Sequence, residues 1–356
     1  MMRIGITTTI YGNNFGEALQ AYAIRKAINT YCTDCHADLI SFMCKSQSRL
    51  VKPGFEVYSD QLFDKNEIFN KFRIEEMGLR DAPHEHLSAD DPPIYDKYVF
   101  GSDQIWNTIA WEIPEFFGSF VPEGKPKIAY AASIGANPEI HAIKEELFRK
   151  YINTFDRISV REKVHCDYLK KFTSKPIYHV ADPTLLLDKE IYYRWAERVN
   201  PPKPDKDYIF YYQPHSADGA IVSLVNKIAR SGHYDVVHTF ADIPSIMFPH
   251  KSISARFCGP KEFLSYIRDS SLVITRSFHA VVFSIIFERP FYVYVDKKTG
   301  SRFESLLHTL GLEDRMIYDY IKPEDVSLNI DYSKTNKLLE QFREESIKFL
   351  VDSINN

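Results

Sequence analysis

The sequence has little that would take it to a membrane or to nucleic acid. None of its apolar runs approaches the ~18–20 residues that a membrane-spanning helix needs. Residues 1–11 lack the charged and then apolar layout of a secretory signal and instead resemble a first strand. The formal net charge of −4 over 356 residues excludes a broadly basic nucleic-acid-binding protein. We therefore expect a cytoplasmic protein with no nucleic-acid partner and at most a peripheral contact with a membrane.

Cysteine is also scarce. The five cysteines do not form the closely spaced set of a disulfide framework. Cys32 and Cys35 form one C-x-x-C motif, but a structural zinc site would need a second well-placed pair. The glycine-rich motifs of dinucleotide and P-loop sites and the H-E-x-x-H motif of zinc enzymes are missing as well. We interpret the cysteines as reduced thiols rather than as metal ligands or a redox centre, and we expect no metal and no bound cofactor.

Apolar and aromatic surface, in contrast, is plentiful. Hydrophobic residues make up 44% of the chain, and 25 Phe and 22 Tyr supply material for a core. Because single cores stop growing near ~250–300 residues, a chain of this length is expected to form two domains.

Short apolar segments alternate with segments of helical periodicity along most of the chain, which is typical of doubly wound parallel α/β sheets. Strands are expected at residues 3–8, 37–42, 95–100, 127–133, 155–160, 177–180, 208–212, 235–240, 272–275 and 291–295. Helices are expected at residues 17–31, 139–153, 162–172, 189–199, 217–231, 261–268, 278–287, 301–310 and 334–354.

A proline-rich stretch at residues 200–204 divides this pattern, and proline makes such a connector stiff. We expect a first α/β domain at residues 1–187 with a variable insertion at 44–93, a helix and connector at 188–206, a second α/β domain at 207–330 and a long helix at 331–356. Two such domains indicate an enzyme with a cleft, and the ligands of open α/β sheets lie beyond the carboxyl ends of the strands.

The loop that follows the expected strand 95–100 carries polar residues suited to a sugar. Asp103 could accept a proton from a hydroxyl group, and Gln104 and Asn107 could hydrogen-bond hydroxyls. Trp106 could lie against the face of a sugar ring. A turn followed by a helix cap would explain the same residues without a ligand.

Cationic and titratable residues follow two other expected strands. Ser277 and His279 open a helix after strand 272–275, where free N–H groups attract anions, and His279 could donate a proton near neutral pH. Arg161 follows strand 155–160 and could hold a carboxylate or phosphate with two hydrogen bonds. The alternative is that Ser277 only caps the helix, His279 belongs to the core and Arg161 pairs with a nearby acid. The neighbouring cations favour function; they are Arg276, Lys298 and Arg302.

Several motifs occur together in a known order. They are Asn14-x-Gly16 with Leu19-Gln20, Gly101-Ser102-Asp103-Gln104-Ile105-Trp106-Asn107, Tyr130-Ala131-Ala132-Ser133-Ile134-Gly135, Ile158-Ser159-Val160-Arg161-Glu162, Asp182-Pro183-Thr184-Leu185-Leu186, Gly259-Pro260-x-Glu262-Phe263, Ser277-Phe278-His279 and Gly300-Ser301-Arg302-Phe303. Each motif is weak alone, but in this order the chain resembles the polysaccharide pyruvyl transferase family from about Gly12 to Arg315.

The resemblance implies a fold like that of GT-B glycosyltransferases, with two Rossmann-like domains facing a cleft. It also implies that phosphoenolpyruvate, as a co-substrate, gives its pyruvyl group to two hydroxyls of a sugar as a cyclic ketal and releases phosphate. The acceptor that it implies is a lipid-linked oligosaccharide of capsule or exopolysaccharide synthesis, met at the inner face of the membrane. Contacts with the acceptor are expected from the insertion at 44–93 of the first domain. The residues expected at the acceptor or elsewhere in the cleft are Asn14, Gly16, Ser102, Gln104, Trp106 and Asn107.

The family's donor residues map onto two positions of this chain. The family arginine after the mid-chain strand maps onto Arg161, and the family histidine maps onto His279, our candidate acid. Asp103 is our candidate base. Better-studied members carry an arginine two residues before the histidine, where this chain has Ser277; the cations that could replace it are Arg276, Lys298 and Arg302.

Two other functions remain open. A glycosyltransferase of the same architecture would use a nucleotide sugar, and it often holds that donor with an acid after a strand of the second domain. Between residues 270 and 295 the only acid is Glu288, which argues weakly against this function. A carbohydrate-binding relative without activity is the other alternative, and the serine at position 277 is its best support.

Overall fold

The computed structural model describes residues 1–43, 59–108, 110, 113–135, 145–214, 218–239, 248, 251–296, 300–319 and 321–356, without the side chains of residues 59–64. Within these residues the chain forms two parallel sheets, each of six strands. The first sheet has the strand order β2-β1-β3-β4-β5-β6. Its strands are β1 (Met2–Thr7), β2 (Cys35–Leu39), β3 (Lys97–Phe100), β4 (Lys127–Ala132), β5 (Arg157–Val160) and β6 (Ile177–His179).

The second sheet has the strand order β12-β11-β10-β7-β8-β9. Its strands are β7 (Tyr208–Tyr212), β8 (Asp235–His238), β9 (Ser252–Ser254), β10 (Leu272–Thr275), β11 (Phe291–Tyr294) and β12 (Met316–Ile317). All five residues of β7 are buried, as expected for a central strand that is covered on both faces.

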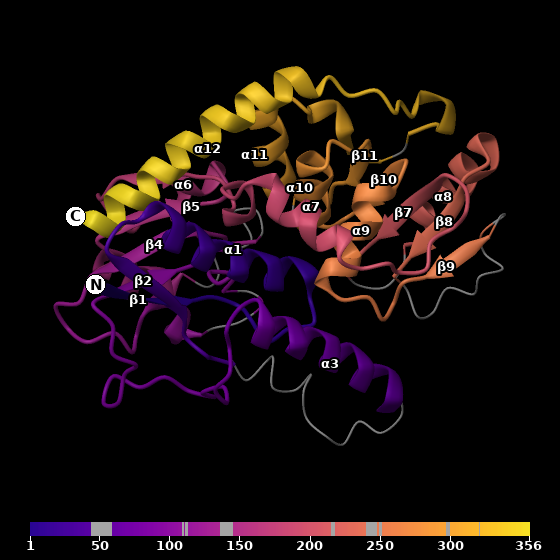
Figure 1. Cartoon of the computed structure of the whole chain (residues 1–356). Coiled ribbons are helices and arrows are strands. Elements are labelled where there is room, and N and C mark those ends of the chain that lie inside the picture. The colour runs from indigo at the N-terminus through magenta and orange to yellow at the C-terminus, as the bar shows by residue number, and fades with distance from the viewer. Residues whose placement is uncertain are drawn as a thin grey trace.

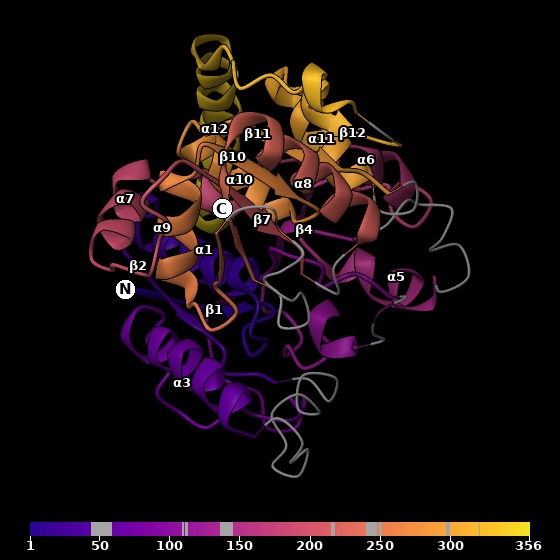
Figure 2. The same cartoon turned by 90° about the vertical axis from the view of Figure 1, so that its right-hand side faces the viewer.

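Helices surround and separate the two sheets (Figures 1 and 2). Figure 1 shows the first sheet on the left and the second on the right, with α12 laid along the top from the second half to the first. The α-helices are α1 (Phe15–Tyr31), α3 (Ser59–Glu75), α5 (Glu146–Tyr151), α6 (Val164–Leu169), α7 (Lys189–Glu197), α8 (Gly219–Gly232), α9 (Pro260–Asp269), α10 (Phe278–Ile286), α11 (Ser301–Leu310) and α12 (Tyr332–Asn355). None of these described helices combines the length and the apolar character that crossing a bilayer requires.

Helix α1 joins the two halves of the core. The side chain of Asn14 caps the N-terminus of this helix. Small buried alanines such as Ala18 and Ala21 let neighbouring elements approach the helix closely. The Phe15 ring stacks on Phe263 of α9 with the centroids 4.5 Å apart. One continuous hydrophobic cluster therefore includes residues of both sheets, of α1 and of α12.

The strand orders contain two switch points. In the first sheet the chain moves from β1 outward to β2 and then returns to the other side of β1 as β3. In the second sheet β7 lies between β8 and β10 in the same way. At such points the loops after adjacent strands diverge and leave a crevice at the carboxyl ends, where α/β proteins bind ligands.

The predicted alternation of strands and helices agrees with these sheets, apart from details of length. The helix expected at 139–153 is shorter, because α5 begins at Glu146 and a 3₁₀ turn, Ile152–Thr154, follows it; residues 136–144 lie outside the described part. The strands β9 and β12 were not predicted, because they have only three and two residues. In the expected insertion at 44–93 the structure has α3, and residues 44–58 lie outside the described part.

Candidate active site

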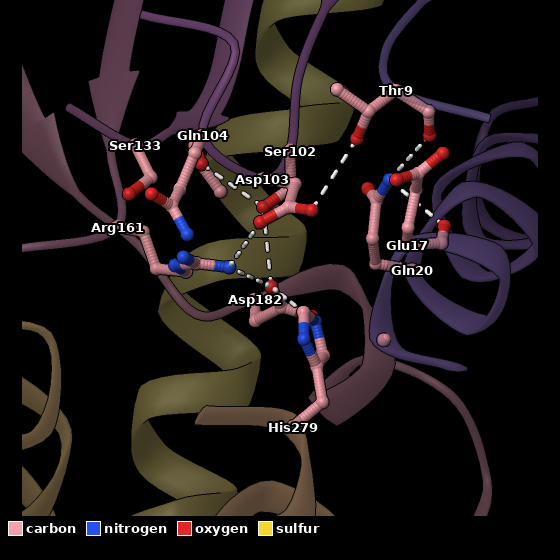
Figure 3. Close-up of polar contacts among 12 residues, drawn as sticks. Thr9, Glu17, Gln20, Ser102, Asp103, Gln104, Ser133, Arg161, Asp182 and His279 are labelled. Carbon is pink, nitrogen blue, oxygen red and sulfur yellow. Dashed lines mark hydrogen bonds and ion pairs between the residues drawn. The ribbon is translucent and has the colours of Figure 1, made fainter. Parts of the chain in front are cut away.

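One group of polar side chains lies between the two halves of the chain, in the loops that follow the carboxyl ends of strands (Figure 3). Loops after β3, β5 and β6 supply Asp103, Arg161 and Asp182, and the first turn of α10 supplies His279 from the second half. Contacts between ionisable side chains link all four residues, so the site is assembled from both halves of the chain.

The loop after β3 has a backbone that few residues can adopt. Gly101 has a φ of +120°, and a Cβ there would collide with the carbonyl oxygen of Tyr130, so this position requires glycine. Asp103 has a φ of +62°, in the left-handed region that aspartate tolerates better than most residues. Its Oδ2 accepts a hydrogen bond from Thr9 Oγ1 at 3.3 Å, and its Oδ1 lies 3.7 Å from Nη1 of Arg161. The loop thus turns the carboxylate of Asp103 toward Arg161.

Arg161 is held by carboxylates on one side and by an aromatic ring on the other. Its Nη1 donates to Asp182 Oδ2 at 2.9 Å, and its Nε donates to Glu162 Oε1 at 3.1 Å. The guanidinium carbon lies 4.1 Å from the centroid of the Phe278 ring, a cation–π contact. Burial alone would lower the pKa of Arg161, but the surrounding carboxylates, Glu162 first, raise it above its usual value. The remaining nitrogen, Nη2, is buried without a hydrogen-bond partner.

Glu162 stabilises this arrangement. It is fully buried; its Oε1 accepts a hydrogen bond from Ser133 Oγ at 2.8 Å, and its Oε2 lies 3.1 Å from Nδ1 of His165. Burial opposes a charge on Glu162, but Arg161 and His165 outweigh burial and lower the pKa of Glu162 to about 2. Glu162 is therefore an anion that fixes Arg161 rather than a group that exchanges protons near neutral pH.

Asp182 is the buried carboxylate that connects the site. It follows β6, and its Oδ1 accepts hydrogen bonds from Thr184 N at 3.0 Å and from Thr184 Oγ1 at 2.7 Å. Its Oδ2 accepts from Arg161 Nη1 and, at 3.2 Å, from Ser102 Oγ, and it lies 3.5 Å from Nε2 of His279. Burial would raise the pKa of Asp182, but the nearby His279 and Arg161 hold it well below its usual range. Sequence analysis named Asp182 in a motif but not as a site residue, although its place directly after a strand was a usable signal.

His279 lies at the start of α10. Ser277 caps that helix by accepting a hydrogen bond from Ala280 N at 3.4 Å. The His279 side chain is buried, with Nε2 on the side of Asp182 and with no hydrogen bond to Nε2. On its other side the ring lies directly against Gly16 of α1, where a Cβ would overlap Nδ1. Gly16 therefore contributes by leaving room for the imidazole.

Arg302, in the first turn of α11, is close to the same group. Burial lowers the pKa of Arg302, and the like charge of Arg161 lowers it further. Its Nε is buried without a hydrogen-bond partner, as are Nη2 of Arg161 and Nε2 of His279. Among the described residues the Nε atoms of Arg157, Arg289 and Arg315 are also buried without a partner. Arg161, His279 and Arg302 differ from these because they gather at one place, where their cationic and titratable side chains are suited to an anion.

Two of the remaining predicted donor residues, Arg276 and Ser277, have other partners. Arg276 is half-buried and pairs with two carboxylates, Asp218 Oδ2 at 3.3 Å and Asp296 Oδ2 at 3.6 Å. Ser277 serves as the cap of α10. Lys298 lies outside the described residues. Of the three cations considered as replacements for a family arginine, the structure places Arg302 beside Arg161.

Two predicted acceptor residues contact each other, and a third has a structural role. Asn107 Nδ2 donates a hydrogen bond to Gln104 Oε1 at 3.0 Å, so these two half-buried amides form one polar unit beside Gly135. Asn14 is exposed, and its side chain accepts hydrogen bonds from the N–H groups of Gly16 and Glu17 as the cap of α1. Asn14 therefore positions the start of α1 through the helix backbone.

The expectation for Trp106 is wrong. Its side chain is fully buried, stacks on Phe117 with the centroids 5.6 Å apart and donates a hydrogen bond from Nε1 to the Phe116 carbonyl at 3.2 Å. A ring enclosed in this way has no face for a sugar. The apolar packing available to tryptophan outweighed the sugar-facing position that its loop suggested.

A buried polar network at the start of α1 was not predicted from the sequence. Gln20 Nε2 donates to Thr8 Oγ1, to the Thr9 carbonyl and to the Glu17 carbonyl, at 3.0 to 3.3 Å. Glu17 Oε1 accepts a hydrogen bond from Gly12 N at 2.5 Å. Burial raises the pKa of Glu17 to about 7. This network fixes the loop after β1, whose Thr9 binds the carboxylate of Asp103.

Solved structures first define the class of the fold. The chain resembles the UDP-GlcNAc 2-epimerase of Neisseria meningitidis bound to UDP-GlcNAc, with a TM-score of 0.54 at 10% identity over 99% of this chain and 98% of that chain. It is also similar to the UDP-N-acetylglucosamine 2-epimerase of Rickettsia bellii, with a TM-score of 0.52 at 9% identity over 100% and 98% of the two chains. The fold is thus of the GT-B type, with two Rossmann-like α/β domains and a long C-terminal helix.

Sequence comparison then gives the family. No curated protein sequence matches the chain significantly. A sequence model of polysaccharide pyruvyl transferases, however, matches residues 14–296, which include Asp103, Arg161, Asp182 and His279. The chain belongs to the polysaccharide pyruvyl transferase family and is accordingly a transferase of polysaccharide biosynthesis.

Proposed function

We propose that this protein transfers the pyruvyl group of phosphoenolpyruvate to two hydroxyls of one sugar, forming a cyclic ketal and releasing phosphate, in capsular or exopolysaccharide biosynthesis. The three unpartnered nitrogens of Arg161, His279 and Arg302 are the observation that carries the proposal. Phosphoenolpyruvate has one carboxylate and one phosphate, and guanidinium groups bind both with charge-assisted hydrogen bonds.

The start of α10 supports anion binding at the same place. The first N–H groups of a helix have no partner within the helix, and the helix dipole is positive at this end. His279 belongs to this first turn, and Arg161 contacts the ring of the preceding residue, Phe278. The backbone and the side chains there attract the same kind of ligand.

His279 is the proposed acid of the reaction. It would donate a proton to the methylene carbon of the donor, which becomes a methyl group and leaves a cation-like centre at C2. A sugar hydroxyl then attacks C2 and gives its proton to Asp103. The C2–O bond to phosphate breaks, and the leaving phosphate takes up the proton held by Asp103. A second hydroxyl then closes the ring at C2 and gives its proton to His279. One hydroxyl proton thus ends on phosphate and the other replaces the proton that His279 gave to the methyl group, so the reaction is balanced.

Cationic side chains would supply most of the rate acceleration. Arg161 and Arg302 would stabilise the charge that develops on the leaving phosphate, and such preorganised donors usually contribute more than a single acid or base. One acid or base adds about 10²–10⁴-fold. The proposed chemistry requires no metal and no further cofactor.

The acceptor is proposed to bind on the side of the first domain. Asp103 faces Arg161 from that side, and the amide pair of Gln104 and Asn107 follows it in the same loop. Hydroxyl groups of a sugar match such amide and carboxylate partners. We propose a lipid-linked oligosaccharide as the acceptor, met by a cytoplasmic protein at the inner face of the membrane.

The decisive test is incubation of the protein with phosphoenolpyruvate and a panel of lipid-linked saccharides. We expect one saccharide to gain the mass of one pyruvyl ketal while one phosphate is released. His279→Ala should lower phosphate release by at least about 100-fold, the contribution of one catalytic acid. The matched control is His308→Ala, because His308 is exposed and pairs only with Glu313.

Two other results would replace the proposal. Release of a nucleotide from a nucleotide sugar would identify a glycosyltransferase of the same fold. Tight binding of phosphoenolpyruvate without turnover on any saccharide would identify a carbohydrate-binding relative without activity. Retained turnover in His279→Ala would remove His279 from the mechanism.

A further inference from the structure

The buried carboxylate of Asp182 connects a cation of the first half with the imidazole of the second. The Oδ1 atom of Asp182 is fixed by two hydrogen bonds from Thr184, so the carboxylate cannot rotate freely. Its Oδ2 faces Arg161 Nη1 at 2.9 Å and His279 Nε2 at 3.5 Å. A single oxygen atom therefore sets the positions of both groups relative to each other.

The two contacts of this oxygen differ in strength. The distance to Arg161 is that of a strong charge-assisted hydrogen bond. The distance to His279 is longer than a normal hydrogen bond, and Nε2 has no partner within hydrogen-bond geometry. A proton on Nε2 is therefore attracted by the carboxylate of Asp182 but makes no hydrogen bond to it.

The charge on Asp182 also decides which nitrogen of His279 carries a proton. An imidazole nitrogen without a proton presents a lone pair, and a lone pair 3.5 Å from an ionised carboxylate would be repelled. Asp182 stays ionised, because its Oδ2 accepts a charge-assisted hydrogen bond from Arg161 and its Oδ1 accepts two hydrogen bonds from Thr184. On the opposite side the ring meets Gly16, which offers no charged group.

We propose that Asp182 is a positioning residue of this transferase: it keeps a proton on Nε2 of His279 beside Arg161, whose own position Glu162 also secures. Asp182 belongs to the first half of the chain and His279 to the second. Asp182 can therefore keep the proton on Nε2 of His279 only when the two halves are packed together. The protonation at Nε2 can be tested without a substrate, whereas its consequence for turnover rests on the proposed function.

The first test is the ¹⁵N spectrum of histidine side chains in the wild-type protein, labelled on histidine and free of ligand. The signals of His279 are assigned by their loss in His279→Gln. We expect Nε2 of His279 to carry a proton at neutral pH, and we expect Asp182→Asn to mix this form with the form protonated only on Nδ1. A wild-type His279 protonated only on Nδ1 would overturn the proposal, whatever the protein catalyses.

The second test separates donor binding from turnover. In Asp182→Asn, Glu162 still holds Arg161, so the Kd for phosphoenolpyruvate should change by less than about threefold, roughly 0.7 kcal/mol. Single-turnover phosphate release should fall about 100-fold, because the acid is no longer prepared. The control is Asp167→Asn, the same change at an exposed carboxylate that pairs with Lys170. It should change the rate by less than about threefold.

The outcomes remain distinguishable. Loss of donor binding in parallel with the rate would mean that Asp182 only maintains structure, and an unchanged rate in Asp182→Asn would mean that it does not act on His279. If the wild-type protein releases no phosphate with any saccharide, the proposed function fails while the ¹⁵N spectrum still decides the role of Asp182. If Asp182→Asn does not fold, the wild-type spectrum alone decides.

Discussion

Replacing Gly16 by alanine should displace the imidazole of His279. A Cβ at position 16 would overlap Nδ1 of the ring, and non-bonded heavy atoms settle about 3.5 Å apart. The ring would therefore have to retreat by about 1 Å or more. A misplacement of this size in a catalytic group can lower a rate by about 100-fold.

The effect of this substitution on stability should be much smaller. Alanine in a helix is more favourable than glycine by about 0.5–1 kcal/mol, because it restricts the unfolded chain. Overpacking costs about 1–3 kcal/mol. These terms partly cancel, so we expect Gly16→Ala to lose at most about 2.5 kcal/mol and to remain folded.

The assay is single-turnover phosphate release from phosphoenolpyruvate, with urea unfolding measured on the same preparations. Gly219→Ala is the matched control, because Gly219 also lies in the first turn of a helix and a Cβ there meets nothing within 4 Å. Its turnover should equal that of the wild type. A folded Gly16→Ala protein with wild-type turnover would refute the packing of His279 against α1 as the source of its position.

Three further predictions concern separate parts of the site. Since the pKa of Glu17 is raised from 4.5 to about 7, protonated Glu17 stabilises the fold at low pH, and this contribution is lost as the pH rises from about 4.5 through 7. The urea stability of the wild type relative to Glu17→Gln should thus fall by roughly 2–4 kcal/mol between pH 4 and 8, and a difference that does not vary with pH would disprove the shift. Arg302→Ala should raise the KM for phosphoenolpyruvate about 10–100-fold in steady-state kinetics. The side chain of Arg276 pairs with Asp218 and Asp296, so Arg276→Ala should change this KM by less than about threefold. Equal effects of the two substitutions would contradict the assignment of Arg302 to the donor site. Trp106→Phe should lower the free energy of unfolding by about 1–3 kcal/mol and leave the KM for the acceptor unchanged, and a raised acceptor KM would return this ring to the sugar site.

The strands and helices were predictable where local pattern and burial agree. The strand β10 and the helix α11 have the predicted bounds, because continuous apolar residues and a clear 3.6-residue period leave little choice. The strands β9 and β12 could not be predicted in this way, because a segment of two or three residues shows no periodicity. Their pairing with neighbouring strands, rather than their sequence, makes them strands.

The candidate site was only partly predictable. Arg161 and His279 each follow a strand, and the rule that ligands lie at carboxyl ends is enough to select both. Asp182 follows a strand as well, but its contacts with Arg161 and with His279 of the other half depend on distances that no local pattern contains. Trp106 was predicted to contact a sugar because of its position in a loop after a strand. The aromatic residues around it determine its orientation instead and enclose it in the core.

The helix α12 has a consequence for how the protein is made. It returns from the second half to the first, where Ser346 Oγ accepts a hydrogen bond from Ala181 N, beside Asp182, and Arg343 Nε donates to the Leu186 carbonyl. The ribosome therefore releases the first sheet long before the helix that completes its packing has been synthesised. Until then the first half exposes the apolar surface that α12 later covers, and the segment that carries Asp182 lacks its contact with Ser346.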